Sequence, residues 1–397
     1  MIKKSINFIW GNIRDTNFLV LLFVFAELTK VVGFLPPIPD VVTYVILMMY
    51  SLYCLFNAKT YDVMFIMLLA YIPLEILITS PDSMFSPWLR YFLFAIIIIS
   101  CTSLCASRKL VLMRARIFEI TCLCCAILGV GSFFAYFLGI NYMRVYNFSD
   151  VTIVGLFGGL TQHSMLLGPV AGVGTLYLAD IALKRKNRIL GALTAFCFIC
   201  VLLSASRSAV LSTIAGILVL IRMRVNNIGK FFKYIIAIFI VFACTLPLWQ
   251  NSISGLVEKQ NKNVTSGSTF NSREDKWEQR IVEFKSSPIF GYGFASVDPA
   301  NKDNSIEAGG KSIETGSSWL SVLSMTGVVG FFIIMRIYVR SFSLAYQWRK
   351  ESLLLSVLIL LSVNMFTEGY IFFGGSFLAF LFWITIGVCS DRKYCIT

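Results

Sequence analysis

The sequence predicts an all-α polytopic membrane protein with about 12 transmembrane helices and one large extracytoplasmic loop that contains short helices. Three observations lead to this prediction. Of the 397 residues, 57% are hydrophobic and only 14% are charged, which is about half the charged share of a soluble domain. Apolar runs long enough to approach the thickness of a bilayer recur along the chain. Basic residues gather in every second connection between these runs. Such a composition excludes a disordered chain and a cytosolic globular enzyme.

Twelve apolar segments are predicted to span the membrane. They are residues 16–34, 41–57, 61–79, 88–106, 117–140, 164–183, 189–204, 208–221, 234–250, 318–338, 353–367 and 371–389. A spanning helix needs about 20 mostly apolar residues, so several segments are short, and 189–221 also fits a re-entrant pair. The first segment is not a signal peptide, because it lacks a small-residue cleavage site and further spans follow it.

The basic residues orient these segments. With a cytoplasmic N-terminus, the cytoplasmic connections hold 22 of the 34 Lys and Arg residues, and the short outer loops hold only Arg90, Arg144 and Arg207. This distribution follows the positive-inside rule. It accounts for the net charge of +13 without nucleic acid as a partner. Both termini are therefore expected in the cytoplasm.

The chain is expected to have three parts. Residues 1–250 carry the first nine spans, residues 251–317 form the large loop, and residues 318–397 carry the last three spans and a cytoplasmic C-terminus. The large loop holds eight basic and nine acidic residues. It is too long for a simple connector, which indicates a functional role. No internal repeat is visible, whereas many transporters are built from repeats.

Cysteine and histidine usage argues against disulfide and metal chemistry. Most of the 11 Cys residues lie in apolar segments and the large loop has none, so a disulfide framework in the oxidising compartment is not expected. Cys197 and Cys200 have the spacing of a redox motif, but they lie within a span and are interpreted as packing residues. The single His is not accompanied by zinc-ligand spacing. No metal and no cofactor are predicted.

Arg207 is the strongest single candidate for a functional residue. It lies between two apolar runs at the predicted outer surface, where an arginine opposes the orientation rule. Ser206 and Ser208 flank it with hydroxyl groups. A guanidinium fork binds two oxygens at once, so this arrangement suits a phosphate. The alternative is an arginine whose charged head reaches the outer lipid headgroups.

The large loop is predicted to contain an amphipathic helix. Ser272 and Asp275 resemble a capping box, and Trp277 follows on one face before Pro288 ends the helix. Arg273 and Arg280 are seven residues apart, so they share a face and are candidates to hold a diphosphate; Trp277 and Tyr292 are aromatic candidates for substrate contacts. The alternative is a solvated helix with ordinary ion pairs to Glu274 and Glu278.

Other polar residues near the predicted outer face are weaker candidates. His163 at the mouth of a span is either a satisfied interface residue or a proton-transfer group. Arg144 is a candidate substrate contact, or it pairs locally with Asp150. Glu27 and Lys30 are expected to pair within the membrane, and Glu75 and Glu368 lie near outer ends.

Four segments, in order, resemble the bacterial O-antigen polymerase and O-antigen ligase superfamily. They are Gly155-Leu-Phe-Gly-Gly-Leu-Thr-Gln-His163, Ser204-Ala-Ser-Arg207-Ser-Ala, Arg273-Glu-Asp-Lys-Trp277 with Pro288-Ile-Phe-Gly-Tyr-Gly293, and Ser317-Ser-Trp-Leu320 with Gly327-Val-Val-Gly330. The third, an Arg-x-x-x-Trp helix followed by Pro-x-x-Gly-x-Gly, is the most specific. The resemblance covers roughly residues 144–335, and the first 140 residues match only in hydropathy.

This resemblance implies a metal-independent glycosyltransferase of the bacterial inner membrane with a periplasmic large loop. It implies undecaprenyl-diphosphate-linked glycans as donor and acceptor, the bilayer and a chain-length regulator protein as partners, and functional arginines at Arg207 and Arg273. The family's ligase branch has a His near the end of the large loop, where this chain has Glu314-Thr-Gly-Ser-Ser-Trp. The departure favours the polymerase branch, with Glu314 as the nearest candidate base and His163 as a second. The predicted function is polymerisation of repeat units into O-antigen or a related surface polysaccharide, with transfer to lipid A core as the alternative.

A flippase or another transporter is the alternative from a different class. A flippase is expected to place charges inside its spans along a path. Here the distinctive charges gather at one predicted outer face, which favours catalysis at that face.

Overall fold

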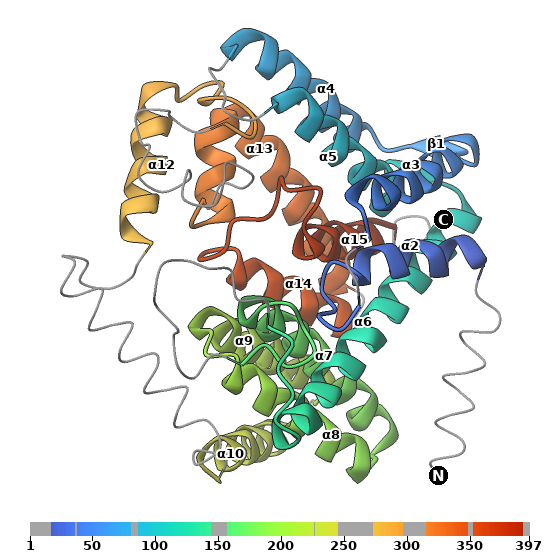
Figure 1. Cartoon of the computed structure of the whole chain (residues 1–397), viewed down its shortest axis with the longest axis vertical. Helices are drawn as coiled ribbons and strands as arrows, with labels where there is room; N and C mark the ends of the chain where they lie inside the picture. The colour runs from blue at the N-terminus through green and yellow to red at the C-terminus, as the bar shows by residue number, and fades with distance from the viewer. Residues whose placement is uncertain are drawn as a thin grey trace.

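The structure is a computed structural model that describes residues 17–35, 38–80, 86–143, 157–225, 227–244, 273–296, 315–347 and 352–391. These residues form thirteen helices and one short two-stranded sheet (Figure 1). The helices are α2 (Phe18–Leu28), α3 (Asp40–Phe56), α4 (Val63–Thr79), α5 (Pro87–Cys101), α6 (Arg108–Phe137), α7 (Ser164–Arg185), α8 (Arg188–Leu203), α9 (Arg207–Arg224), α10 (Ile228–Cys244), α12 (Glu274–Ser286), α13 (Ser318–Gln347), α14 (Ser352–Asn364) and α15 (Phe377–Asp391).

The all-α class is confirmed, and a helix lies at each of the twelve predicted apolar segments. Among the described residues, α6, α7 and α13 are long and apolar enough to cross a membrane, by length and composition. Seven further apolar helices have between 10 and 17 residues. The chain is therefore a helical membrane protein. Its twelve crossings and its orientation stay predictions.

Two details depart from the predicted elements. Strand β1 (Thr60–Tyr61) pairs antiparallel with β2 (Cys105–Ala106), so two predicted helix ends are extended. Helix α6 begins nine residues before the predicted span, because Ser107 accepts a hydrogen bond from the backbone N–H of Leu110 and caps it.

The added first turns of α6 include Arg114, which forms a buried ion pair. The sequence placed it in a charged connection, but its side chain is buried. Its Nε and Nη2 donate to the two carboxylate oxygens of Asp391 at 2.7 Å each, and its Nη1 donates to the carbonyl of Cys105. This bidentate pair ties α6 to the end of α15, and removing one partner would leave the other charge buried.

Helix α15 forms the centre of the molecule. All fifteen of its residues are buried, and in Figure 1 it lies between the group of α3, α4 and α5 and the group of α7, α8 and α9. A buried Trp383 packs edge-on against Phe94 of α5 with ring centroids 5.6 Å apart. A helix that is apolar on all sides belongs in the core of a bundle.

Helices α7, α9 and α14 form the part of the bundle that positions the candidate site. A Cβ at Gly172 of α7 would meet both Thr213 of α9 and Leu360 of α14, and one at Gly216 of α9 would meet the carbonyl of Ser356. These contacts require α9 to run parallel to α7 and antiparallel to α14. The glycines permit the close approach that is typical of helices in membranes.

A charged cluster fixes one end of this three-helix group. Asp180 near the end of α7 accepts hydrogen bonds from Arg224 at 2.7 and 2.8 Å and from Ser352 at 3.0 Å, and it pairs with Lys184. We call this end of the group the Asp180 end. The opposite end, where α7 and α9 begin and α14 finishes, is called the Arg207 end.

Candidate functional site

The antiparallel packing brings separate predicted site segments to one end of the bundle. Helix α9 begins at Arg207, α7 begins directly after His163, and α14 finishes at Asn364, four residues before Glu368. Because the Asp180 cluster holds the other ends of the same three helices together, all of these positions belong to the Arg207 end. Glu368 in turn binds Arg273 of the large loop.

Arg207 is the first residue of α9 and is exposed. The chain turns sharply before it, since Ala205 has a φ of +52°, a conformation that costs free energy for a residue with a Cβ. Ser206 caps the helix, with its hydroxyl accepting from the N–H of Ala209 at 3.3 Å and lying 3.2 Å from the hydroxyl of Ser208. Both serines therefore shape the helix start that presents Arg207.

Helix α12 presents Arg273 at its beginning. Arg273 is the N-cap of α12 and makes no side-chain cap, while the predicted cap Ser272 lies outside the described residues. Arg273 Nη2 lies 3.0 Å from a carboxylate oxygen of Glu368, and both side chains are largely buried, at 11% and 19% exposure. The pair fixes the loop helix to the segment that connects α14 and α15.

Arg280 is placed differently from the prediction. Its side chain is only 4% exposed and pairs with Glu283 at 2.7 Å. Glu283 is itself buried. A cation held by a buried carboxylate on its own helix contributes to the packing of α12, and a diphosphate shared by Arg280 and Arg273 stays a prediction.

Trp277 joins α12 to the end of the large loop. Its indole N–H donates to the carbonyl of Gly316 at 3.1 Å. Beyond Gly316, the Ser318 hydroxyl donates to the backbone carbonyl of Glu368 at 2.7 Å and accepts from the N–H of Tyr370 at 2.9 Å. Three segments that are far apart in the sequence thus form one hydrogen-bonded unit around the Arg273–Glu368 pair, with Trp277 as a structural member of it.

Tyr370 completes this unit from the connection between α14 and α15. Its hydroxyl donates to the carbonyl of Leu361 at 3.0 Å. Burial, and to a smaller extent the Glu368 carboxylate, raise the pKa of Tyr370 well above its ordinary value, because both disfavour the phenolate. Tyr370 therefore remains protonated and keeps its donor role.

The Pro-x-x-Gly-x-Gly segment after α12 is anchored to two other helices. Tyr292 and Gly293 donate their backbone N–H groups to the carbonyls of Ser324 and Met325 in α13, at 2.8 and 3.1 Å. The next residue, Phe294, donates its N–H to both carboxylate oxygens of the buried Glu75 of α4, at 3.1 Å each. Glu75, a weak candidate from sequence, therefore holds the segment that bears Tyr292.

His163 has a structural role that sequence left open. Its Nδ1 accepts the backbone N–H of Met165 at 3.1 Å and so caps α7. The preceding Gln162 donates its side-chain amide to the carbonyls of Thr29 and Val32 after α2, at 3.2 Å each. The expected pair of Glu27 and Lys30 is also confirmed, at 2.8 Å.

Two polar residues at the Arg207 end were missed by sequence reasoning. Asn364 and Thr315 are each 1% exposed. Both amide atoms of Asn364 and the hydroxyl of Thr315 have no hydrogen-bond partner among the described residues. Buried polar atoms normally have partners. Asn364 has apolar neighbours in the sequence and Thr315 lies in a polar segment, and neither context indicated a buried polar group without a partner.

Some predicted site residues lie outside the described residues. These are Arg144, its possible local partner Asp150, and Glu314, together with most of the large loop. The approach of Arg207 to Arg273 across a shared anion site also stays a prediction. Among the described residues, no group of three or more potential metal ligands lies together.

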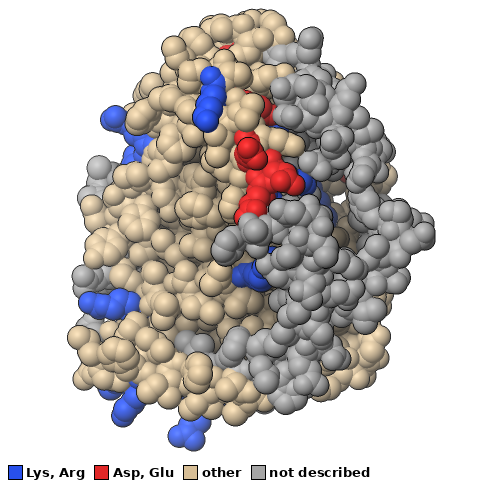
Figure 2. Space-filling view, turned by 90° about the vertical axis from the view of Figure 1, so that its left-hand side faces the viewer, with Lys and Arg blue, Asp and Glu red and all other residues tan. Residues whose placement is uncertain are grey.

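Figure 2 shows the face of the molecule toward which α12 lies. The acidic side chains in view gather in its upper half, with a basic side chain beside them, whereas the other basic side chains are spread over the left and lower parts of this face. The first turn of α12 contains two acidic residues, Glu274 and Asp275.

The Cys197–Cys200 pair behaves as a packing feature. Both thiols are buried and donate to backbone carbonyls, Cys197 to Ala171 and Cys200 to Gly129, at 3.2 Å each. Among the described residues, no Lys or Arg contributes to the electrostatic surroundings of either thiol, whereas positive surroundings are what activate a thiol.

Comparison with known proteins matches residues 192–335 to the family described as O-antigen ligase. The matched stretch contains Arg207, Arg273, Trp277 and the Gly291–Gly293 turn. No curated protein matches the chain. The order and spacing of the motifs and the helical membrane fold agree with this match, which supports a relationship of residues 192–335 to the O-antigen ligase and polymerase superfamily.

Proposed function

We propose that the protein is an inner-membrane glycosyltransferase that polymerises undecaprenyl-diphosphate-linked oligosaccharide repeat units, without a metal ion, at the Arg207 end. The observation that carries the proposal is the Arg273–Glu368 pair. It fastens the most specific family motif to the same end of the bundle as the Arg207 helix start.

The charge at this end suits the leaving group of the reaction. The acceptor hydroxyl oxygen attacks the anomeric carbon of the donor, the bond from that carbon to the lipid diphosphate breaks, and the diphosphate departs with the bonding electrons. Negative charge grows on the diphosphate, and fixed arginines stabilise it. The beginnings of α7 and α9 add the positive ends of two helix dipoles.

The acceptor proton needs at most one positioned base. Glu314 is the proposed base, because it precedes the Thr315–Ser318 segment that binds the Glu368 connection. His163 is the second candidate, and its Nδ1 already accepts the α7 cap bond. The acceptor proton would then pass to its Nε2, either from the hydroxyl itself or through a water molecule.

The polymerase branch is favoured over the ligase branch by one sequence feature. The chain contains a single His, His163, and none near the end of the large loop, where the ligase branch of the family has one. Transfer to lipid A core is the second candidate function, and the description of the matched family as O-antigen ligase supports it.

The nature of the acceptor separates the two functions. Purified protein in nanodiscs is incubated with lipid-linked repeat unit alone, and the products are resolved on a gel. A ladder of lengthening lipid-linked glycans is expected for a polymerase. Product that forms only when lipid A core is added would identify a ligase.

Deletion of the gene gives the corresponding result in cells. Lipopolysaccharide that bears a single repeat unit on intact core is expected. Core without any repeat unit, with long polymer accumulating on the lipid carrier, would show that the protein is the ligase and that the role given to Glu314 is wrong.

A further inference from the structure

A cavity of about 460 Å³ opens between helices α7, α8, α9 and α10, away from the Arg207 end. Its volume lies within the roughly 300–1,000 Å³ of ordinary small-molecule sites. Most lining side chains are apolar. They are Ala179, Ala182, Leu183, Ala195, Phe198, Ile217 and Ile221, with polar or charged groups at Thr175, Lys186, Asn187, Arg188, Thr194 and Tyr234.

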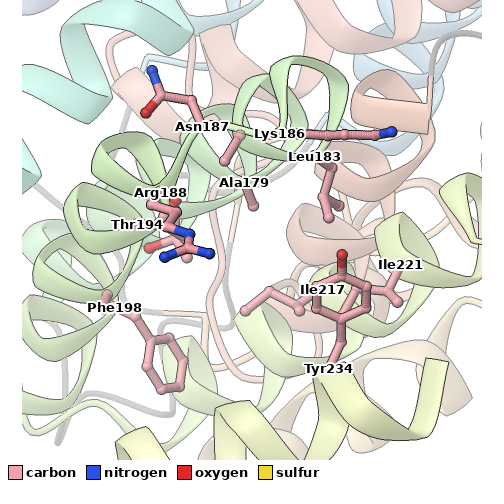
Figure 3. A pocket seen from close by; sticks show the side chains of 14 residues that line it. Ala179, Leu183, Lys186, Asn187, Arg188, Thr194, Phe198, Ile217, Ile221 and Tyr234 are labelled. Atoms are coloured by element: carbon pink, nitrogen blue, oxygen red, sulfur yellow. The ribbon is translucent and has the colours of Figure 1, made fainter. Parts of the chain in front are cut away.

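The two charged residues that line this cavity come from one short stretch of the chain. Lys186 and Arg188 flank the turn between α7 and α8, and both are exposed. In Figure 3, Arg188 and Thr194 lie on one side of the cavity, and Ile217, Ile221 and Tyr234 lie on the other. The cavity therefore has an apolar interior and a cationic rim.

The charge at the rim is not balanced locally. The sequence has no Asp or Glu between residues 181 and 257, and no ion pair of Lys186 or Arg188 occurs within the described part of the chain. The nearest acid along the chain, Asp180, is engaged by Lys184, Arg224 and Ser352. The rim is complementary to an anion, and the interior is complementary to a hydrocarbon chain.

We propose that this cavity binds an anionic phospholipid of the bilayer, with one acyl chain between α8 and α10 and the phosphate at Lys186 and Arg188. Basic pockets between membrane helices recognise anionic headgroups through the same combination of charge and apolar depth. The Asp180 end is the end of the bundle that the positive-inside rule places in the cytoplasm. The glycan donor is expected at the opposite end, so this lipid is a separate ligand, and its binding does not depend on the proposed function.

The geometry of α8 supplies two kinds of variant. Arg188 is the first residue of α8, where a cation opposes the helix dipole, so Arg188→Ala is expected to fold normally. A Cβ at Gly191 meets nothing within 4 Å, so Gly191→Phe extends into open space, and Ala195→Phe fills the cavity from the next turn. Lys230→Ala is the matched control, since Lys230 is an exposed cation of α10 that does not line the cavity.

The test measures lipid binding to the purified full chain in detergent by native mass spectrometry. Dipalmitoyl phosphatidylglycerol is titrated against phosphatidylcholine with the same acyl chains. The wild type is expected to prefer phosphatidylglycerol. Arg188→Ala should weaken its binding roughly tenfold, about 1.4 kcal/mol, and Gly191→Phe or Ala195→Phe should remove binding of both lipids, whereas Lys230→Ala should leave both unchanged.

Three results would overturn the assignment. Equal binding of the two lipids would remove the role of the cationic rim. An equal loss in Lys230→Ala and Arg188→Ala would show a diffuse charge effect instead of a site. Displacement of phosphatidylglycerol by an equimolar amount of undecaprenyl phosphate would assign the cavity to the polyprenyl carrier. None of these results bears on the gel assay of polymerisation, so the two proposals fail independently.

Discussion

At the residue scale, side-chain chemistry predicted which residues belong to the Arg207 end better than it predicted what holds them there. Arg207 and Arg273 both lie at helix beginnings, where Arg207 is exposed and Arg273 is largely buried. Arg280 followed the same seven-residue spacing as Arg273, yet it is buried against Glu283. The face that α12 buries depends on the segments it packs against, and periodicity alone does not identify them.

Arg207→Lys tests the guanidinium fork. An ammonium keeps the charge but binds as a single point, so polymerisation in nanodiscs is expected to fall by roughly 100-fold, the scale for losing one preorganised donor. Arg222→Lys, on the same helix but at its other end, is the control and should retain wild-type activity. Full activity of Arg207→Lys would remove the bidentate diphosphate contact from the mechanism.

The Arg273–Glu368 pair is tested by a double-mutant cycle. Arg273→Ala, Glu368→Ala and the double variant are compared by thermal unfolding in detergent. Because the ion pair is largely buried, a coupling free energy on the order of 1 kcal/mol is expected. The exposed Arg116–Glu119 pair is the control and should give a coupling close to the small values of surface pairs. Additive effects at Arg273 and Glu368 would mean that the pair does not fasten the loop helix.

At the element scale, apolar run length predicted where helices occur, and it failed where a local cap such as Asn227 or contacts between distant segments set the helix ends. Helix α10 begins at Ile228, six residues before the start of its predicted span. Helix α15 begins at Phe377, six residues after the start of its own predicted span. The connection before α15 contains Glu368 and Tyr370, whose partners lie about 50 residues earlier in the chain. The β1–β2 pairing likewise joins residues 60 and 106, a separation that local patterns do not report.

Two glycines test the close packing of the segment after α12 against α13. Gly327 interrupts α13 with a φ of +61°, and Gly291 has a φ of +85°. A Cβ at either one would overlap the backbone at the other. Gly291→Ala and Gly327→Ala should each lower the free energy of unfolding by at least about 1–2 kcal/mol, from the left-handed conformation alone. Gly191→Ala, where a Cβ would meet nothing within 4 Å, should be neutral or slightly stabilising. Unchanged thermal stability of Gly291→Ala and Gly327→Ala would contradict this packing.

At the scale of the whole molecule, the arrangement separates two kinds of chemistry along α7, α9 and α14. The Arg207 end gathers the family motifs, and the Asp180 end gathers compensated charges and the basic turn at Lys186. Parallel and antiparallel packing through Gly172 and Gly216 produces this separation. The sequence indicated it through the positive-inside pattern, because that pattern records which side of the membrane each connection faces.

Orientation is therefore the property that links sequence, fold and function, and cysteine labelling measures it. Thr265→Cys in the large loop and Lys186→Cys in the α7–α8 turn are placed singly in a cysteine-free background. A membrane-impermeant maleimide that reaches the periplasm should label position 265 in intact cells and position 186 only after lysis. The reverse labelling pattern would mean that the protein has the opposite orientation in the membrane. It would put the Arg207 end in the cytoplasm, where lipid-linked repeat units awaiting polymerisation are not expected, and it would contradict the proposal that polymerisation takes place at the Arg207 end.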